Sequence, residues 1–257
     1  MKFCVINSGS SGNMTYVEYN GGAILIDAGI TLTRAKKMAD LDYSKVKAIF
    51  ITHEHIDHIH YLDTISKKLN IPIYIHKKCF KGIFKNLLTK LKQNNALIFF
   101  IDEDSHYDLF DLDIYTLKLS HDSKACLGFL FIEKETEKKL MYITDTGFFP
   151  TNYIPLAKTV DGLIIEANHD IEMLVESGRP YYLIQRILSP EGHMSNYICY
   201  QLLKEVCSDI KVIVLAHLSK DCNSLECVKR DILDPLKDYK GKIVIASRYE
   251  ATKLIKL

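Results

Sequence analysis

Hydrophobic and polar positions along the chain form short apolar runs separated by stretches with helical spacing. Strands are predicted at residues 3–6, 15–19, 23–26, 46–51, 71–75, 112–119, 128–132, 140–143, 161–165 and 211–216. Helices are predicted at residues 32–39, 57–69, 77–92, 197–206 and 225–236, with two further helical stretches before residue 192. This alternation predicts sheets covered by helices. Some connections look like hairpins, so a purely parallel sheet is not expected.

Nothing in the pattern divides the chain. There is no internal repeat, low-complexity segment or Pro/Gly-rich linker, and 47% of the residues are hydrophobic, so residues 1–257 are expected to form a single domain with a full core. No apolar run approaches the roughly 18 residues of a membrane span, and the first run is too short for a signal peptide. A cytoplasmic protein with no membrane partner is therefore expected. The seven cysteines include no Cys-x-x-Cys pair and are interpreted as reduced and mostly structural.

The densest group of metal-binding side chains directly follows the predicted strand 46–51. The segment Thr52-His53-Glu54-His55-Ile56-Asp57-His58-Ile59-His60 contains four histidines together with Asp57. His53 and His55 would point apart on a helix, but they converge in an extended segment, and Asp57 and His58 are expected to begin the next helix. Divalent metals prefer imidazole and carboxylate ligands, so a metal site is predicted rather than a solvated loop. The zincin motif is excluded, because its second histidine would fall at Asp57.

Further polar residues follow other predicted strands. His121, Asp145, His169 and His217 each come just past an apolar strand, where open α/β sheets place their sites, so a shared site is expected. Asp27 follows the strand 23–26. Its carboxylate would accept the second ring N–H of a metal-bound histidine, although an N-cap role for the next helix is an equally good interpretation.

Two weaker features concern phosphate binding. The loop Asn7-Ser8-Gly9-Ser10-Ser11-Gly12-Asn13 would suit an anion-binding nest, although on its own pattern an ordinary hairpin turn is the favoured interpretation. The formal net charge of +1 gives no global attraction for nucleic acid. Residues 77–92, however, contain no acidic residue, and they carry the lysines Lys77, Lys78, Lys81, Lys85, Lys90 and Lys92. They are a candidate contact for a phosphate backbone, although an amphipathic helix with a solvated lysine face is the favoured interpretation.

Taken in order, the motifs resemble those of the metallo-β-lactamase superfamily. The resemblance spans almost the whole chain and rests on Asp27, His53-x-His55-x-Asp57-His58, His121, Asp145 and His217. It implies an α/β (α+β) fold, a four-layer αβ/βα sandwich in which two mixed β-sheets are flanked by helices, with a dinuclear metal site along one edge.

Within the superfamily, four segments resemble the YycJ (WalJ) branch, which is similar to the phosphodiesterase and nuclease members. They are Ser8-Gly9-Ser10-Ser11-Gly12-Asn13, Glu166-Ala167-Asn168-His169-Asp170, Gly192-His193-Met194-Ser195-Asn196 and His217-Leu218-Ser219. That branch implies DNA exonuclease activity. Tyr61 and Met194 depart from the usual glycine and leucine and would reshape a pocket rim. Asp145 replaces the cysteine of the best-known lactamases, and His55 stands where diiron flavoprotein relatives carry Glu, which disfavours a redox role.

The resemblance also implies roles for individual residues. Two divalent ions are expected, Zn or Mn with Fe as a further option. One would be held by His53, His55 and His121 and the other by Asp57, His58 and His217, with Asp145 shared. A hydroxide formed between the ions would attack phosphorus. His193 resembles the extra histidine of the tRNA 3′-processing branch and would donate a proton or hydrogen bond to the leaving oxygen. Asp57 and Asp27 are also assigned to the catalytic residues. Four residues are assigned to substrate binding: His169, Asn196, Ser10 and Ser11. For His169, a seventh-ligand or structural role is an equal alternative.

The predicted function is therefore a metal-dependent hydrolase, specifically a phosphodiesterase or nuclease with an exonuclease-like action, for which DNA is favoured over RNA; the sequence leaves open DNA versus RNA and exo versus endo cleavage. The same site would also suit hydrolysis of a small ester, thioester or lactone. A metal-stabilised regulatory protein without catalysis is the third hypothesis; it is disfavoured because a structural zinc needs only about four ligands and no acid. The oligomeric state is left open by the sequence.

Overall fold

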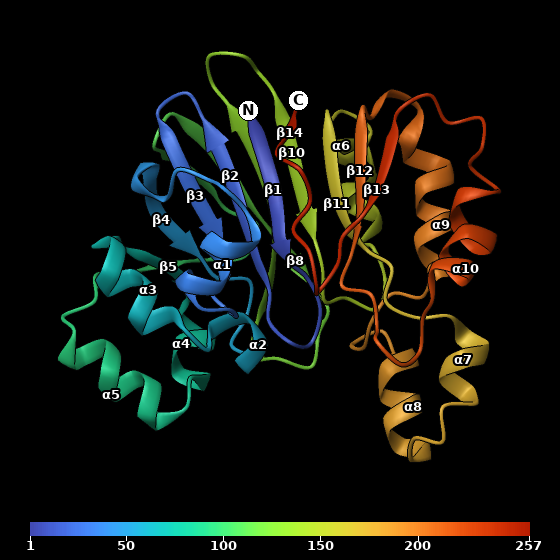
Figure 1. Cartoon of the computed structure of the whole chain (residues 1–257), viewed down its shortest axis with the longest axis horizontal. Coiled ribbons are helices and arrows are strands. Elements are labelled where there is room, and N and C mark those ends of the chain that lie inside the picture. Colours follow the sequence, from blue (N-terminus) through green and yellow to red (C-terminus); the bar gives the residue numbers. More distant parts are fainter.

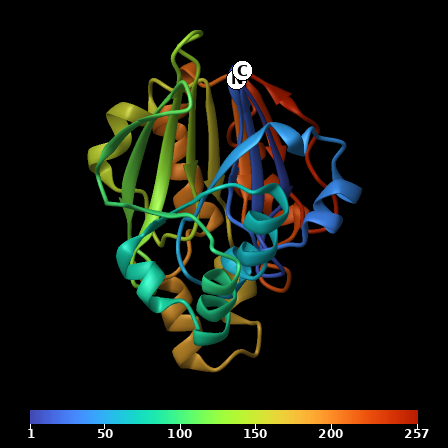
Figure 2. The same cartoon turned by 90° about the vertical axis from the view of Figure 1, so that its left-hand side faces the viewer.

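Two β-sheets face each other in the computed structural model, which describes residues 1–257, and helices cover both outer faces (Figures 1 and 2). The first sheet contains β1 (Lys2–Asn7), β2 (Met14–Tyr19), β3 (Gly22–Ile26), β4 (Val46–Phe50), β5 (Ile73–His76), β6 (Ile98–Ile101) and β14 (Ile255–Lys256). The second contains β7 (His106–Leu109), β8 (Leu112–Leu119), β9 (Cys126–Glu133), β10 (Lys139–Ile143), β11 (Gly162–Glu166), β12 (Val212–Ala216) and β13 (Lys242–Ile245).

Both sheets are mixed. The first has the strand order β14-β1-β2-β3-β4-β5-β6, antiparallel from β14 to β3 and parallel from β3 to β6. The second has the order β13-β12-β11-β10-β9-β8-β7, antiparallel from β7 to β10 and parallel from β10 to β13. The carboxyl ends of the parallel strands in each sheet therefore share one edge, where a site is expected.

The helices divide between the two outer faces. Those that follow strands of the first sheet are α1 (Leu32–Met38), α2 (Ile56–Ile59), α3 (Leu62–Leu69), α4 (Lys77–Gly82) and α5 (Lys85–Gln93). Those of the second half are α6 (Ile154–Ala157), α7 (Ile171–Val175), α8 (Tyr181–Leu188), α9 (Asn196–Val206) and α10 (Leu225–Val228). Helices α7 and α8 form a small projection that packs around its own buried cluster, which includes Leu174 and Ile187.

Three large apolar clusters fill the spaces between the four layers. The central cluster joins the two sheets; in it Phe50 stacks on Tyr74 with ring centroids 4.7 Å apart and meets the edge of Phe129 at 5.8 Å. The second lies between the first sheet and α1 to α5, and the third between the other sheet and helices that include α6 and α9. The central strands are covered on both faces, which explains their continuous apolar runs. This arrangement confirms the predicted αβ/βα sandwich.

The structure corrects three predicted helices. Residues 57–69 form two helices, since the chain turns at Tyr61, whose N–H donates to the carbonyl of Ala28 at 2.9 Å. The predicted helix over residues 77–92 is broken at Ile83, where the backbone is extended and the side chain is buried. Beyond α10 the chain continues as a π-helix, Lys229–Leu233. The short strands β6, β7, β13 and β14 were not predicted.

None of the helices combines the length and the apolar character that a membrane crossing requires.

Candidate metal centre

Three predicted site residues occupy sharp bends just past the ends of strands. Asp27 follows β3, Asp145 follows β10 and His217 follows β12, with φ angles of 62°, 59° and 55°. These are left-handed backbone conformations, which non-glycine residues adopt only when the surrounding structure holds them there, and which gather at functional sites. All three side chains are buried. The bends therefore turn polar groups inward at the shared edge of the two sheets.

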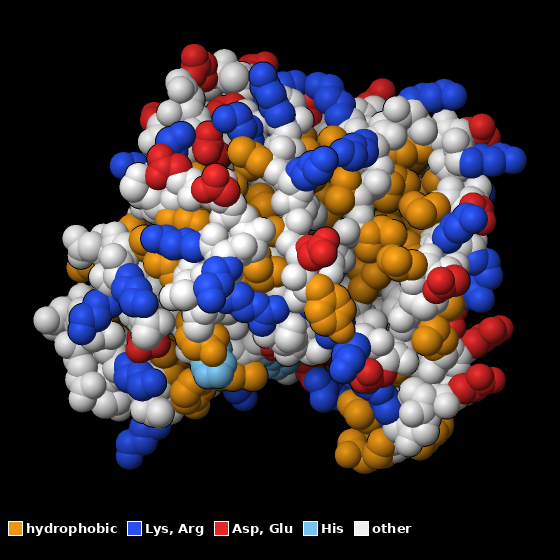
Figure 3. Space-filling model, viewed as in Figure 1, with side chains coloured by type: hydrophobic (Ala, Val, Ile, Leu, Met, Phe, Trp, Pro, Cys, Tyr) orange, Lys and Arg blue, Asp and Glu red, His pale blue; other side chains and the backbone are white.

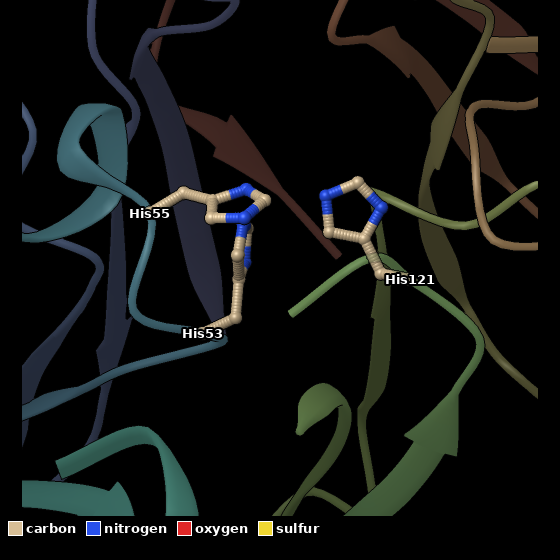
Figure 4. A group of neighbouring side chains, drawn as sticks. All are labelled: His53, His55 and His121. Carbon is tan, nitrogen blue, oxygen red and sulfur yellow. The ribbon is translucent and has the colours of Figure 1, made fainter. Parts of the chain in front are cut away.

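One group of possible ligands consists of His53, His55 and His121. One nitrogen from each ring lies within 4.8 Å of the others, and Figure 4 shows His53 and His55 turned towards the same space as His121, which comes from the opposite side. The ring centroid of His53 is 4.6 Å from that of His55 and 4.9 Å from that of His121. The extended backbone after β4 thus lets the two neighbouring histidines converge, as the spacing predicts.

A second group consists of Asp57, His58 and His217, whose ligand atoms also lie within 4.8 Å of one another. Asp145 belongs to two further groups of the same kind. The first combines it with His53 and His58, and the second with Glu166, His193 and His217. Asp145 therefore lies between the two histidine groups. All seven predicted metal ligands come together in one place.

Neighbouring groups hold several histidine rings through Nδ1. Asp27 Oδ2 accepts from His58 Nδ1 at 2.7 Å, and the carbonyl of Gly192 accepts from His121 Nδ1 at 3.2 Å. Such bonds fix the tautomer that leaves Nε2 free to bind a metal. The alternative role of Asp27 as a helix cap is not realised, because the side chain of Thr31 caps α1.

Several buried atoms in the cluster have no hydrogen-bond partner. They include Nε2 of His53, Nε2 of His217 and Oδ2 of Asp145. A buried polar atom left unpaired costs about 1–3 kcal/mol, so three such atoms in one cluster call for partners. Divalent cations on the two sides of Asp145 would satisfy them, since Asp145 groups with His53 on one side and with His217 on the other, and the mixed imidazole and carboxylate set suits Zn, Mn or Fe. The residues present therefore fit divalent metal binding.

Burial and neighbouring charges set the protonation of these groups. Burial lowers the pKa of His53 well below its usual value, and the nearby His58 lowers it further, so the ring is neutral, as a ligand must be. Burial alone would also lower the pKa of His58 and His217. Carboxylates outweigh it in both cases: Asp27 and Asp57 raise the pKa of His58, and Asp145 helps raise that of His217 to about 10. The carboxylates thus favour positive charge at these two positions, which either a ring proton or a bound divalent cation would supply.

Glu166, the last residue of β11, is a site residue that the sequence interpretation did not assign. It is fully buried, and its Oε1 accepts from His193 Nδ1 at 2.8 Å and from His217 Nδ1 at 2.9 Å. Burial would raise the pKa of this carboxyl, but His193 and His217 lower it below the usual range. Its position directly at a strand end, like that of Asp27, was a signal that would have identified it.

The predicted substrate-binding residues lie in different surroundings. His169 is buried and neither ring nitrogen has a hydrogen-bond partner, yet it is not among the grouped ligand atoms. Asn196 is buried with its amide bonded to Asn223 at 3.0 Å, which favours a structural role over a phosphate contact. Ser10 and Ser11 are both exposed, and of the two only Ser10 lines the cavity beside His193 and His217.

The Gly-Ser loop supports the site more directly through other residues. Ser8 Oγ accepts from the backbone N–H of His217 at 2.7 Å. The side-chain amide of Asn13 lies 3.1 Å from Asp57 Oδ2 and 3.0 Å from His58 Nε2. The loop therefore contacts Asp57 and His58 through Asn13 and His217 through Ser8. Beyond connecting two strands, it supports all three residues of the second ligand group.

Basic side chains border the site despite the small net charge. A cavity of about 190 Å³ next to His193 and His217 is lined in part by Arg179, Arg186 and Lys220. A second cavity, of about 470 Å³ on the side of His121, has three lysines in its lining: Lys78, Lys118 and Lys124. Of the lysines in residues 77–92, Lys78 thus reaches the surroundings of the metal centre. Acidic residues share both linings: Asp221 pairs with Arg179 at 3.2 Å, and Glu103 pairs with Lys118 at 3.2 Å. The charge that borders the site is therefore mixed.

Two packed mixed sheets with this histidine and aspartate cluster at their shared edge define a metallo-β-lactamase fold, and the chain belongs to the beta-lactamase superfamily. Residues 23–218 match the family model described as "Beta-lactamase superfamily domain". The chain is 32% identical to exodeoxyribonuclease YycJ of Bacillus anthracis, over 93% of this chain and 90% of that protein. It is also 32% identical to exodeoxyribonuclease WalJ of Streptococcus pneumoniae, over 91% and 88%.

Among solved structures, the metallo-beta-lactamase fold protein YhfI from Bacillus subtilis superposes with a TM-score of 0.71. It shares 18% identity and covers 98% of this chain and 99% of its own, which shows the common fold. These comparisons confirm the predicted superfamily and the resemblance to the YycJ and WalJ branch.

Proposed function

We propose that the chain is a metal-dependent phosphodiesterase that acts on DNA as an exonuclease. The observation that carries this proposal is the set of buried, unpartnered ligand atoms of His53, Asp145 and His217 at the meeting point of the two histidine groups. The two relatives named as exodeoxyribonucleases, each matched over most of its length, support the choice of DNA as substrate.

The geometry supports two metal positions. His53, His55 and His121 would hold one ion, Asp57, His58 and His217 the other, and Asp145 would be shared between them. Bound divalent ions supply Lewis-acid charge that activates water and neutralises charge developing on a phosphate. The ions are proposed to be Zn or Mn, with Fe compatible with the same ligands.

His193 is the residue proposed to assist the leaving oxygen. Its Nδ1 is held by Glu166 Oε1 at 2.8 Å, which leaves Nε2 to carry a proton or donate a hydrogen bond. Its side chain is 18% exposed, compared with 0% for Glu166, so His193 is the member of this pair that a substrate reaches. Asp57 and Asp27 act through the metal ligands: Asp57 as a ligand itself and Asp27 by orienting His58.

Basic side chains on both sides of the cluster are compatible with a phosphodiester chain. The two cavities carry Arg179, Arg186 and Lys220 on one side and Lys78, Lys118 and Lys124 on the other. Such cations suit successive phosphates of a strand, which would replace the carboxylates that pair with Arg179, Arg186, Lys78 and Lys118. His169 and Ser10 remain proposed substrate contacts; a cytoplasmic location and a single domain also remain predictions.

The test uses purified protein with its bound metal quantified, supplied with Mn²⁺ or Zn²⁺. Bis(p-nitrophenyl) phosphate and end-labelled single- and double-stranded DNA are offered in parallel. Cleavage of both substrates, abolished by a chelator and reduced at least tenfold by His193→Ala, is expected. Metal bound with neither substrate cleaved would refute the proposal and direct the search to thioesters and lactones.

A further inference from the structure

A third cavity, of about 620 Å³, lies on the far side of the segment that follows His217. Its apolar lining consists of Leu218, Leu225, Ile243, Ile245, Ala246 and Tyr249. We call it the β13 cavity, because Ile243 and Ile245 belong to that edge strand. Figure 3 shows hydrophobic side chains gathered on this face of the molecule, and the volume falls in the range of about 300–1,000 Å³ typical of ligand sites.

The β13 cavity adjoins the cavity beside the metal centre. Its lining shares Leu218, Ser219 and Lys220 with the smaller cavity that opens onto His193 and His217. Ser8 also lines it, and the same hydroxyl accepts from the backbone N–H of His217 at 2.7 Å. A ligand that runs from the metal centre past Leu218 would therefore enter this cavity.

The charged residues that line the β13 cavity are all basic. Lys220 and Arg248 are its charged lining residues, and the lining contains no Asp or Glu. Arg248 is held in place, because its guanidinium donates to the carbonyl of Leu218 and its own carbonyl accepts from Arg34 at 2.9 Å. An apolar floor with fixed positive charge at its edge suits a ligand that combines flat apolar rings with phosphates.

Tyr249 supplies a stacking surface at the rim. Its side chain is 71% exposed although it lines an apolar cavity, and Leu225 beside the same cavity is 63% exposed. Exposed aromatic rings next to basic residues are the usual means of binding single-stranded nucleic acid without sequence preference. The free edge of β13 would also suit an added peptide strand, but the basic lining and the residues shared with the cavity beside the metal centre favour the nucleic acid.

We infer that the β13 cavity binds unpaired bases of the DNA strand whose phosphate lies at the metal centre, with Tyr249 stacking on a base and Lys220 and Arg248 contacting phosphates. This inference rests on the proposed function and names the part of the substrate that lies beyond the cleavage site. It assigns the protein a preference for single-stranded over fully paired substrate.

The experiment compares the wild-type protein with Tyr249→Ala, Tyr249→Phe and a matched control, Tyr115→Ala, at a partly exposed tyrosine on β8. Binding is measured by fluorescence anisotropy with a labelled single-stranded oligonucleotide that has phosphorothioate linkages. Tyr249→Ala is expected to raise Kd about tenfold, the effect of one base-aromatic stack, whereas Tyr249→Phe and Tyr115→Ala stay near wild type. Turnover of bis(p-nitrophenyl) phosphate, which has no base, is expected to stay unchanged in every variant.

A second probe makes the test specific. An oligonucleotide with abasic positions is expected to bind wild type about tenfold more weakly and to lose nothing further in Tyr249→Ala. An unchanged Kd in Tyr249→Ala, or an equal loss for the intact and abasic strands, would overturn the inference and leave β13 as a peptide-docking edge. Because binding is measured without cleavage, failure of this inference is distinct from failure of the proposed function, which the small substrate reports.

Discussion

Asp27→Asn removes one buried charge from the metal centre without changing the shape of the side chain. Asp27 is fully buried, its Oδ2 accepts from His58 Nδ1 at 2.7 Å, and its Oδ1 accepts from the backbone N–H of Thr52 at 2.9 Å. Asn tolerates the left-handed backbone found here, at φ 62°, better than most residues do. The fold is therefore expected to survive, and the effect should fall on the metal.

The magnitude follows from the number of acceptors. The two oxygens of Asp27 accept from His58 Nδ1 and from the backbone N–H and hydroxyl of Thr52, whereas Asn has one oxygen, so either His58 or the backbone N–H of Thr52 loses its partner. Groups that orient a metal-bound histidine are worth about 10- to 100-fold in metal affinity, or roughly 1.4–2.7 kcal/mol. Since no orientation of the Asn amide satisfies both donors, we expect a loss in the upper half of this range.

The assay is competition for Zn²⁺ or Mn²⁺ between the protein and a chromophoric chelator. Asp113→Asn is the matched control, because Asp113 pairs with His106 at 2.7 Å on the surface hairpin of β7 and β8, away from the cluster. Asp113→Asn should bind metal like wild type. If Asp27→Asn also binds within threefold of wild type, the orienting role of Asp27 is refuted.

Three further predictions test other parts of the account. Glu166→Gln should lower phosphodiester turnover at least tenfold while the protein stays folded. One carboxylate oxygen accepts from both His193 and His217 and the other from the backbone N–H of Thr146, so the amide nitrogen of Gln leaves one side without an acceptor; unchanged turnover with normal metal content would contradict this. Lysine partners lower the pKa of Asp161 to about 2, so the ionised carboxylate should stabilise the folded protein by about 1 kcal/mol after solvent screening. This stabilisation should be complete above pH 4 and should disappear as the pH falls towards 2. Urea unfolding of wild type and Asp161→Asn should therefore differ at pH 7 and converge near pH 2. Phe50→Ala should destabilise the protein by about 3–5 kcal/mol in the same assay, because it empties the core between the sheets; a loss under 1 kcal/mol would show that the sheets close over the gap.

The sequence predicted the strands of the sheet interior and the ligands at their ends well, because both depend on local patterns. Continuous apolar runs such as the one ending at Ile26 mark strands covered on both faces, and the polar residue after each run marks the sheet edge. The resemblance to a known superfamily then supplied the grouping of ligands, which the atoms of His53, His55 and His121 match.

Other features depend on contacts between distant parts of the chain. The bend at Tyr61 is held by the carbonyl of Ala28, so the spacing of residues 57–69 gave no sign of a break. The edge strands β6 and β13 are short and half exposed, and their patterns are therefore weak. The strand-end position of Glu166 marks it as a candidate, but its partners His193 and His217 lie 27 and 51 residues away, so the local pattern does not show which rings it orients.

The most direct test of the central claim is a titration of metal-free protein with Mn²⁺ or Zn²⁺, with bound metal per chain and phosphodiester turnover measured on the same samples. Two ligand groups that share Asp145 predict turnover that rises as metal is added and reaches its maximum at about two ions per chain. Asp145→Ala, which removes the shared ligand, should prevent full loading. Full turnover without bound metal, or two bound ions with no cleavage of any phosphodiester, would contradict the account.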